Sequence, residues 1–121
     1  MKIKESGEMY LETILILSKT SDEIHAVKIS EYMNFSKPSV SRALGILRRA
    51  GYIEINKEDH IFLTPAGREI AEKMYERHNV ISRALMAIGV SETAAVADAC
   101  KIEHDISDET FSAIKNHFGK I

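Results

Sequence analysis

The sequence predicts a mainly α-helical fold in which three helices and a β-hairpin come first and three further helices follow. Three observations predict it. Apolar residues recur every three or four positions over most of the chain, which is typical of amphipathic helices. Residues 52–63 instead contain two short β-branched runs separated by a polar turn, as a hairpin does. Helix-start signals occur at Ser36-Lys37-Pro38, before the helix that precedes this segment, and at Thr64-Pro65, directly after the segment.

The first three helices are predicted over residues 5–18, 27–33 and 37 to about 50. Ser36 can cap the third helix, and Pro38 falls in its first turn, where a missing N–H costs nothing. The buried stripe of this helix is predicted to consist of Val40, Ala43, Leu44 and Leu47. Gly51 ends the helix, because glycine readily takes the left-handed conformation that follows a helix.

The hairpin is predicted from strands at 52–55 and 61–63. After it, Thr64 is expected to cap a long fourth helix that Gly89 ends, and the last two helices are capped by Ser91 and Ser107. The second and third helices are joined by a short turn, so residues 1–64 are predicted to form a winged helix-turn-helix and residues 65–121 a short helical unit. Any small helical domain with a hairpin remains the alternative.

The composition bounds the class of protein. The chain has 121 residues, of which 45% are hydrophobic, enough for a packed core. A single cysteine, Cys100, cannot form an internal disulfide, which argues against a stapled secreted domain. The start of the chain has no signal-peptide hydrophobic region, and the longest aliphatic run, 14–17, is too short to cross a bilayer. We therefore expect a soluble, cytoplasmic protein with no membrane partner.

The third predicted helix carries a local positive charge, although the net charge of the chain is −2. Between residues 37 and 49 there are four basic residues and no acidic one. Such a helix would attract a phosphate backbone, and its exposed N-terminal half could reach bases in the major groove. The predicted DNA contacts, to bases and to phosphates, are Ser36, Lys37, Pro38, Ser39, Arg42, Arg48, Arg49, Lys57 and His60. A solvated basic helix face is the alternative.

The fifth predicted helix carries a group of metal-ligand types. Cys100, Glu103 and His104 are spaced i, i+3 and i+4, so they share one face and can converge on a single ion. Further candidate ligands on the first and fourth helices are Met9, Glu12 and His78. Each of these residues is by itself more often part of a core or a surface, and only the Cys-x-x-Glu-His unit is a specific signal.

Several motifs, in order along nearly the whole chain, resemble the diphtheria-toxin-repressor family of metal-dependent transcriptional regulators. They are Glu8-Met9-Tyr10-Leu11-Glu12, Ser36-Lys37-Pro38-Ser39-Val40-Ser41-Arg42, Leu63-Thr64-Pro65-x-Gly67-Arg68, His78 and Cys100-x-x-Glu103-His104-x-x-Ser107-Asp108. The resemblance implies a DNA-binding regulator, expected to be a repressor, of iron or manganese homeostasis. It also implies that the helical unit dimerises and that the metal binds between the winged helix and this unit.

The same resemblance implies a mixed set of metal ligands. The residues that match the activating site of the iron-responsive members are Met9, Cys100, Glu103 and His104. The residues that match additional ligands of the manganese-responsive members are Glu12 and His78. Thioether and thiolate are soft donors, which suit Fe²⁺, Co²⁺ or Ni²⁺ better than Mn²⁺. We expect Fe²⁺ as the ion and Mn²⁺ as the second choice, with Co²⁺, Ni²⁺ and Zn²⁺ as surrogates.

The expected partners are a palindromic operator in double-stranded DNA and a second copy of the chain. Two alternatives stay open: a winged-helix regulator that responds to a small molecule or to no metal, and a metalloenzyme built on the same ligands. We expect neither enzymatic activity nor a small-molecule substrate, because the sequence offers no nucleophile–base pair and no Gly-rich phosphate loop.

Overall fold

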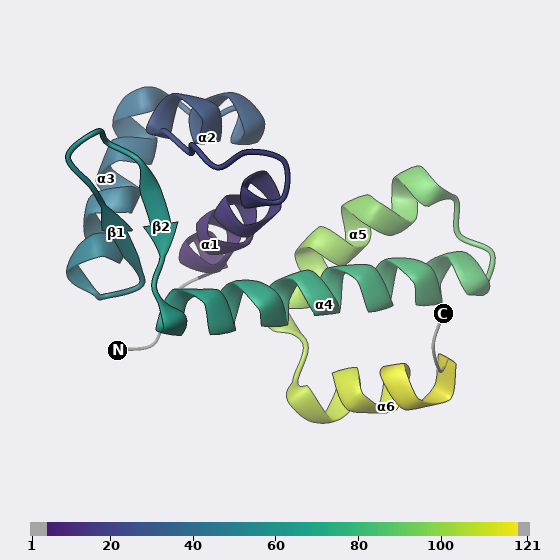
Figure 1. The fold of residues 1–121 in the computed structure, drawn as a ribbon. Helices are drawn as coiled ribbons and strands as arrows, with labels where there is room; N and C mark the ends of the chain where they lie inside the picture. The colour runs from purple at the N-terminus through teal and green to yellow at the C-terminus, as the bar shows by residue number, and fades with distance from the viewer. Residues whose placement is uncertain (1–4, 119–121) are drawn as a thin grey trace. The chain divides into compact units, whose positions relative to one another are not determined.

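A computed structural model describes residues 5–118, and the chain divides into two compact units after Glu72 (Figure 1). The first unit contains α1 (Glu5–Ser18), α2 (Ala26–Met33), α3 (Lys37–Arg49), β1 (Ile53–Ile55), β2 (Ile61–Leu63) and the start of α4 (Pro65–Ala87). The second unit contains the rest of α4 with α5 (Glu92–Asp105) and α6 (Asp108–Phe118). The predicted mainly helical fold, with a hairpin wing after the third helix, is confirmed.

The turn between α2 and α3 is formed by local signals. Asn34 ends α2 in the left-handed conformation, with a φ of 57°. The Ser36 side chain accepts a hydrogen bond from the Ser39 N–H at 3.3 Å, which confirms the predicted cap of α3. The side chains of Val40, Leu44 and Leu47 are buried, whereas Ala43 of the predicted stripe is half-buried. Gly51 follows the helix with a φ of 87°, as expected for a helix stop.

The wing is a two-stranded antiparallel hairpin in which Ile53 pairs with Leu63 and Ile55 with Ile61. Its turn is closed by the Asn56 side chain, whose Oδ1 accepts hydrogen bonds from the N–H groups of Glu58 at 3.0 Å and His60 at 2.9 Å. The turn also places Asp59 in the left-handed region, with a φ of 63°. A side-chain-closed turn of this kind replaces the Asn-Gly or Asp-Gly pair that usually marks a hairpin.

Thr64 connects the wing to α4 and to the end of α3. Its Oγ1 accepts a hydrogen bond from the Gly67 N–H at 3.2 Å, which confirms the predicted cap, and donates one to the Gly51 carbonyl at 2.7 Å. Gly67 lies against the backbone of Tyr52, because a Cβ built on this glycine would be only 2.0 Å from the Tyr52 carbonyl oxygen. The first turn of α4 can pack here only without a side chain.

We therefore expect Gly67→Ala to destabilise the protein by about 1–3 kcal/mol, the usual cost of forcing extra volume into a packed region. Chemical denaturation of the full chain measures this change. Gly45→Ala is the matched control, because its new Cβ would meet only the flexible Arg49 side chain at 3.4 Å and alanine is the better helix former. Equal stability of the two variants would contradict the close approach of α4 to Tyr52.

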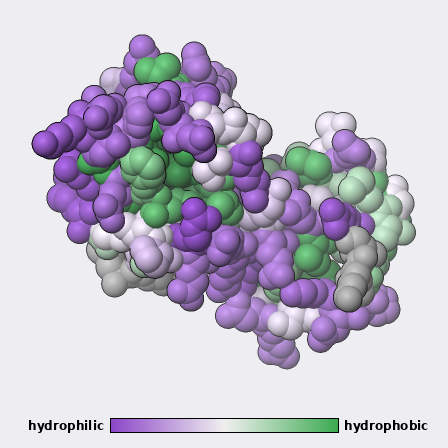
Figure 2. All heavy atoms as spheres, in the orientation of Figure 1, coloured by the Kyte–Doolittle hydropathy of each residue, from purple (hydrophilic) through white to green (hydrophobic). Residues whose placement is uncertain are grey.

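Each unit has its own apolar interior. In the first, the buried residues that lie outside the α3 stripe include Leu11, Ile14, Ile29, Ile53 and Ile61. In the second, Ile81, Ala99 and Phe111 form the centre of a cluster to which α4, α5 and α6 each contribute one residue. Hydrophilic residues cover most of the face shown in Figure 2, with smaller groups of hydrophobic residues among them. Within residues 5–118, no helix is both long and apolar enough to cross a membrane.

Candidate metal centre and nucleic-acid interface

The basic surface of α3 is exposed along its whole length. Ser36, Lys37, Pro38, Ser39, Arg42, Arg48 and Arg49 are all exposed. The opposite side of α3 carries the buried aliphatic stripe and packs into the first unit. The basic side chains therefore point away from this unit, toward solvent. Ser36 and Ser39 also hydrogen-bond to each other through their hydroxyls at 2.9 Å, which orders the first turn. The geometry is that of a helix able to enter a DNA groove.

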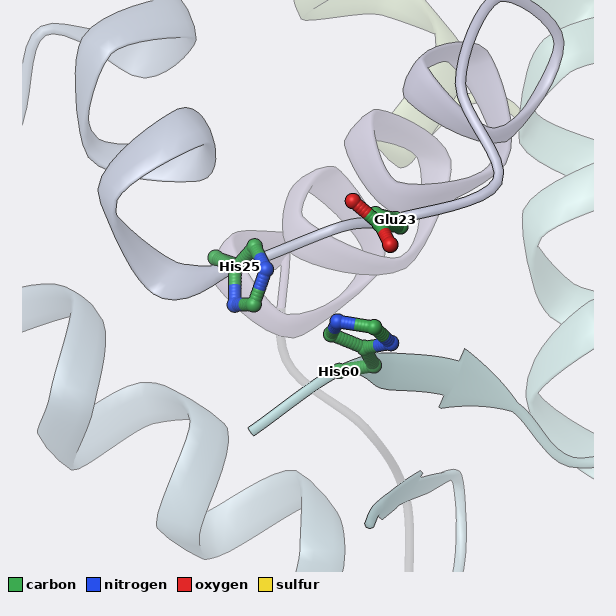
Figure 3. Close-up of side chains that lie close together, drawn as sticks. All are labelled: Glu23, His25 and His60. Carbon is green, nitrogen blue, oxygen red and sulfur yellow. The ribbon is translucent and has the colours of Figure 1, made fainter. Parts of the chain in front are cut away.

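The two predicted contacts on the wing are placed differently from each other. Lys57 is exposed in the turn of the hairpin. His60 is half-buried, and its ring meets that of His25 edge to face, with centroids 4.6 Å apart (Figure 3). His60 is therefore engaged with the segment before α2, a contact that the sequence did not indicate.

Three predicted metal ligands converge in the second unit. The ligand atoms of His78 on α4 and of Cys100 and Glu103 on α5 all lie within 4.8 Å of one another. His78 Nδ1 is 3.3 Å from Glu103 Oε2 and 3.8 Å from Cys100 Sγ. Cys100 is exposed, so it is not part of the apolar cluster of this unit. Imidazole, thiolate and carboxylate together form a donor set for a divalent transition metal.

His104 lies beside this cluster on the next position of α5. Its Nε2 is 3.3 Å from Glu103 Oε1, so the two oxygens of the Glu103 carboxylate face two different imidazoles. Glu103 is 1% exposed. Burying a carboxylate is costly unless charged or hydrogen-bonding groups face it, and a cation held by the same residues would satisfy this need.

Met9 and Glu12 are placed on α1, in the first unit. They are three positions apart, so they share one face of this helix. Their side chains are half-buried and buried, respectively.

Arg77 is a functional neighbour that sequence reasoning missed. It is buried, and its guanidinium donates hydrogen bonds to the carbonyls of Glu103 at 3.1 Å and Ile106 at 2.8 Å and to the Asp108 carboxylate. It therefore joins the end of α5, where the cluster lies, to the start of α6. The Lys73 ammonium and then the Arg77 guanidinium hold the pKa of Asp108 below its usual range. No local pattern in the sequence indicates this arrangement, because the acceptors lie 26, 29 and 31 positions after Arg77.

The fold and these residues define a class: a winged helix-turn-helix protein with a basic recognition helix and a second helical unit that carries a cluster of metal ligands. The comparisons with known proteins identify the family. The family model described as the N-terminal DNA-binding domain of iron-dependent repressors matches residues 2–61, and the model of their metal-binding and dimerisation domain matches residues 64–121. The chain belongs to the iron-dependent repressor family, which includes the diphtheria-toxin-repressor-like regulators that its motifs resemble.

Two curated relatives that are similar to the chain are named as regulators of transcription or as repressors. The transcriptional regulator MntR of Escherichia coli is 33% identical over 112 residues, which cover 93% of the chain and 72% of MntR. The iron-dependent repressor IdeR of Mycobacterium tuberculosis is 29% identical over 109 residues, which cover 89% of the chain and 47% of IdeR. The name of the second relative states a dependence on iron.

Solved structures share the fold. The manganese regulator SloR superposes with a TM-score of 0.85 and 25% identity, over 100% of the chain and 56% of SloR. The IdeR of T. acidophilum superposes with a TM-score of 0.81 at 23% identity, over 98% of the chain and 55% of that protein. The chain thus spans about half the length of these solved proteins.

Proposed function

We propose that the chain is a metal-dependent regulator, and specifically a repressor, of genes for iron or manganese homeostasis. The observation that carries this proposal is the convergence of His78, Cys100 and Glu103 on one point of the second unit, in a chain whose α3 exposes a basic face. The proposed function implies a cytoplasmic location, where the chain would meet DNA, and it requires no catalysis.

The proposed activating ion is bound by Cys100, Glu103 and His104, with His78 as a further ligand. We propose that Met9 and Glu12 of the first unit add a thioether and a carboxylate to this set. The spacing of these two residues on one face of α1 and the match of both to family motifs support this assignment. When bound, the ion would be coordinated at the same time by side chains from different helices.

Fe²⁺ is the proposed physiological ion, because the thiolate of Cys100 and the thioether of Met9 are softer donors than Mn²⁺ prefers. Mn²⁺ is the second candidate, because Glu12 and His78 add harder donors and because the manganese regulator SloR is similar to the chain. Co²⁺, Ni²⁺ and Zn²⁺ fit the same donors as surrogates.

We propose that two copies of the chain bind a palindromic operator. A two-fold dimer presents two recognition helices, which reach successive major grooves about 34 Å apart. In the second unit, Met86, Ile88 and Val96 are exposed large apolar side chains that can be covered by a second copy. Metal that binds the DNA-competent arrangement more tightly shifts the population toward it, and DNA must then tighten metal binding equally.

An anaerobic titration tests this function, with binding to selected palindromic DNA as the readout. We expect Fe²⁺ to increase DNA affinity and a chelator to reverse the increase. DNA binding that is unchanged by metal or chelator would refute the proposal and favour the small-molecule alternative. Activation by Mn²⁺ at concentrations where Fe²⁺ has no effect would reject the choice of iron alone.

Arg42 is the proposed base-reading residue of α3, because its guanidinium can bond guanine at two positions from the exposed face of the helix. We expect Arg42→Ala to weaken binding to the cognate operator by about 1–3 kcal/mol while metal affinity of the free protein stays unchanged. Fluorescence anisotropy with operator and scrambled DNA measures the change. Lys19→Ala, which removes an exposed positive charge just after α1, is the control and should bind the operator normally.

A further inference from the structure

The first unit contains a second cluster of metal-ligating side chains, formed by Glu23, His25 and His60 (Figure 3). One ligand atom of each residue lies within 4.8 Å of the others. The two imidazole rings meet edge to face at an interplanar angle of 80°. None of the three residues is among the proposed ligands of the activating ion.

A single backbone hydrogen bond brings the three residues together. The Ile61 N–H donates to the Ile24 carbonyl at 2.8 Å, which joins the segment before α2 to the first residue of β2. The side chains of Ile24 and Ile61 are both buried. Successive side chains of an extended segment point to opposite sides. Glu23 and His25 flank the buried Ile24, and His60 precedes the buried Ile61, so all three side chains point away from the interior.

The backbone of both histidines is held in place before any ion binds. His60 donates its N–H to Asn56 Oδ1 at 2.9 Å and accepts a hydrogen bond from the Asn56 N–H at 3.0 Å. His25 is the N-cap residue of α2, and its carbonyl accepts hydrogen bonds from the N–H groups of Lys28 and Ile29. Its side chain makes no capping hydrogen bond. Ligands on such ordered backbone lose less freedom when they bind an ion.

We propose that Glu23, His25 and His60 bind a zinc ion, in a site separate from the activating centre. Two imidazole nitrogens and one carboxylate oxygen are an established ligand set for zinc, with water in the fourth position. Imidazole donors favour Zn²⁺ over Mn²⁺, and no thiolate or thioether is present here to favour a softer ion. The exposed side chain of Glu23 leaves the cluster open to the ion and its water. The bound ion links the segment before α2 to the wing and restrains the wing within the first unit.

Zinc binding to the full chain tests this site after the other centre has been disabled by the pair Cys100→Ala and His104→Ala. Competition with a chromophoric chelator measures the number of ions and their affinity. We expect the paired variant to keep one zinc ion per chain. Adding His25→Gln or His60→Gln should weaken zinc binding by more than the roughly 10–100-fold that losing an outer-shell partner costs. Glu58→Gln, an exposed wing acid outside the cluster, is the matched control and should bind zinc as the paired variant does.

Amide NMR spectra locate the ion and show that each variant is folded. In the paired variant, zinc should shift the signals of residues 23–25 and 56–61 and leave those of α5 and α6 unchanged. The proposal would be overturned if the paired variant bound no zinc, or if adding His25→Gln or His60→Gln left its zinc affinity unchanged. Shifts of amide signals confined to the second unit would also overturn it. None of these outcomes involves DNA binding, so they leave the proposed regulatory function untouched.

Discussion

Arg77→Ala is expected to destabilise the second unit by about 1–3 kcal/mol, the cost of leaving a buried hydrogen-bonding group without its partner. The substitution removes the donors that now satisfy the carbonyls of Glu103 and Ile106, and it removes a partner of the Asp108 carboxylate. It also removes the guanidinium that lies 5.4 Å from the centroid of the Phe111 ring, in the centre of the apolar cluster. Urea unfolding followed by circular dichroism measures the effect.

Arg83→Ala on the same helix is the control for Arg77→Ala. Arg83 is exposed, so we expect its loss to change the free energy of unfolding by about 0.5 kcal/mol or less. A comparable loss of stability in both variants would show that the effect comes from α4 itself rather than from the hydrogen bonds to α5 and α6. Arg77→Ala should also lower metal affinity, because Arg77 fixes the backbone at Glu103.

His104→Ala is expected to leave a folded chain whose DNA affinity no longer rises with metal. Coupling between two sites typically amounts to about 5–150-fold in affinity, and the whole of this metal-dependent gain should vanish. The physical reason is that His104 places an imidazole 3.3 Å from the Glu103 carboxylate, on the helix face that carries Cys100. Anisotropy titrations of the operator with and without Fe²⁺ measure the gain.

His117→Ala controls for the loss of an imidazole, because His117 is exposed near the end of α6. It should keep the full response to metal. If His104→Ala responded to Fe²⁺ as the unchanged chain does, His104 would have no part in activation. If His104→Ala also lost the DNA binding that the unchanged chain shows without metal, the substitution would have damaged the DNA-binding unit rather than the response to metal.

The elements of the fold were predictable because their signals act over a few residues. The caps at Ser36, Thr64 and Ser91 each bond a backbone N–H three positions further on, so the sequence alone contains both partners. Gly51 and Gly89 follow their helices with positive φ for the same local reason. The convergence of Cys100 and Glu103 is likewise a property of one helix.

The remaining contacts depend on segments that are distant along the chain. Arg77 is buried because three acceptors at the end of α5 and the start of α6 surround it, whereas a periodicity argument expects an arginine at the surface. The ring of His60 contacts that of His25, and the backbone hydrogen bond between Ile24 and Ile61 that accompanies this contact has no sequence signature. Such pairings follow from packing, which spacing rules do not include.

Because α4 continues without a break across the boundary between the units, this helix is a poor place for inserted or deleted residues. The chain divides after Glu72, inside an unbroken helix of 23 residues. One inserted or deleted residue at this point would turn every later side chain of α4, including Arg77 and His78, by about 100° about the helix axis. Functional relatives should therefore show insertions in the wing turn or the connection between α4 and α5, and a constant number of residues between the glycine at 67 and the histidine at 78.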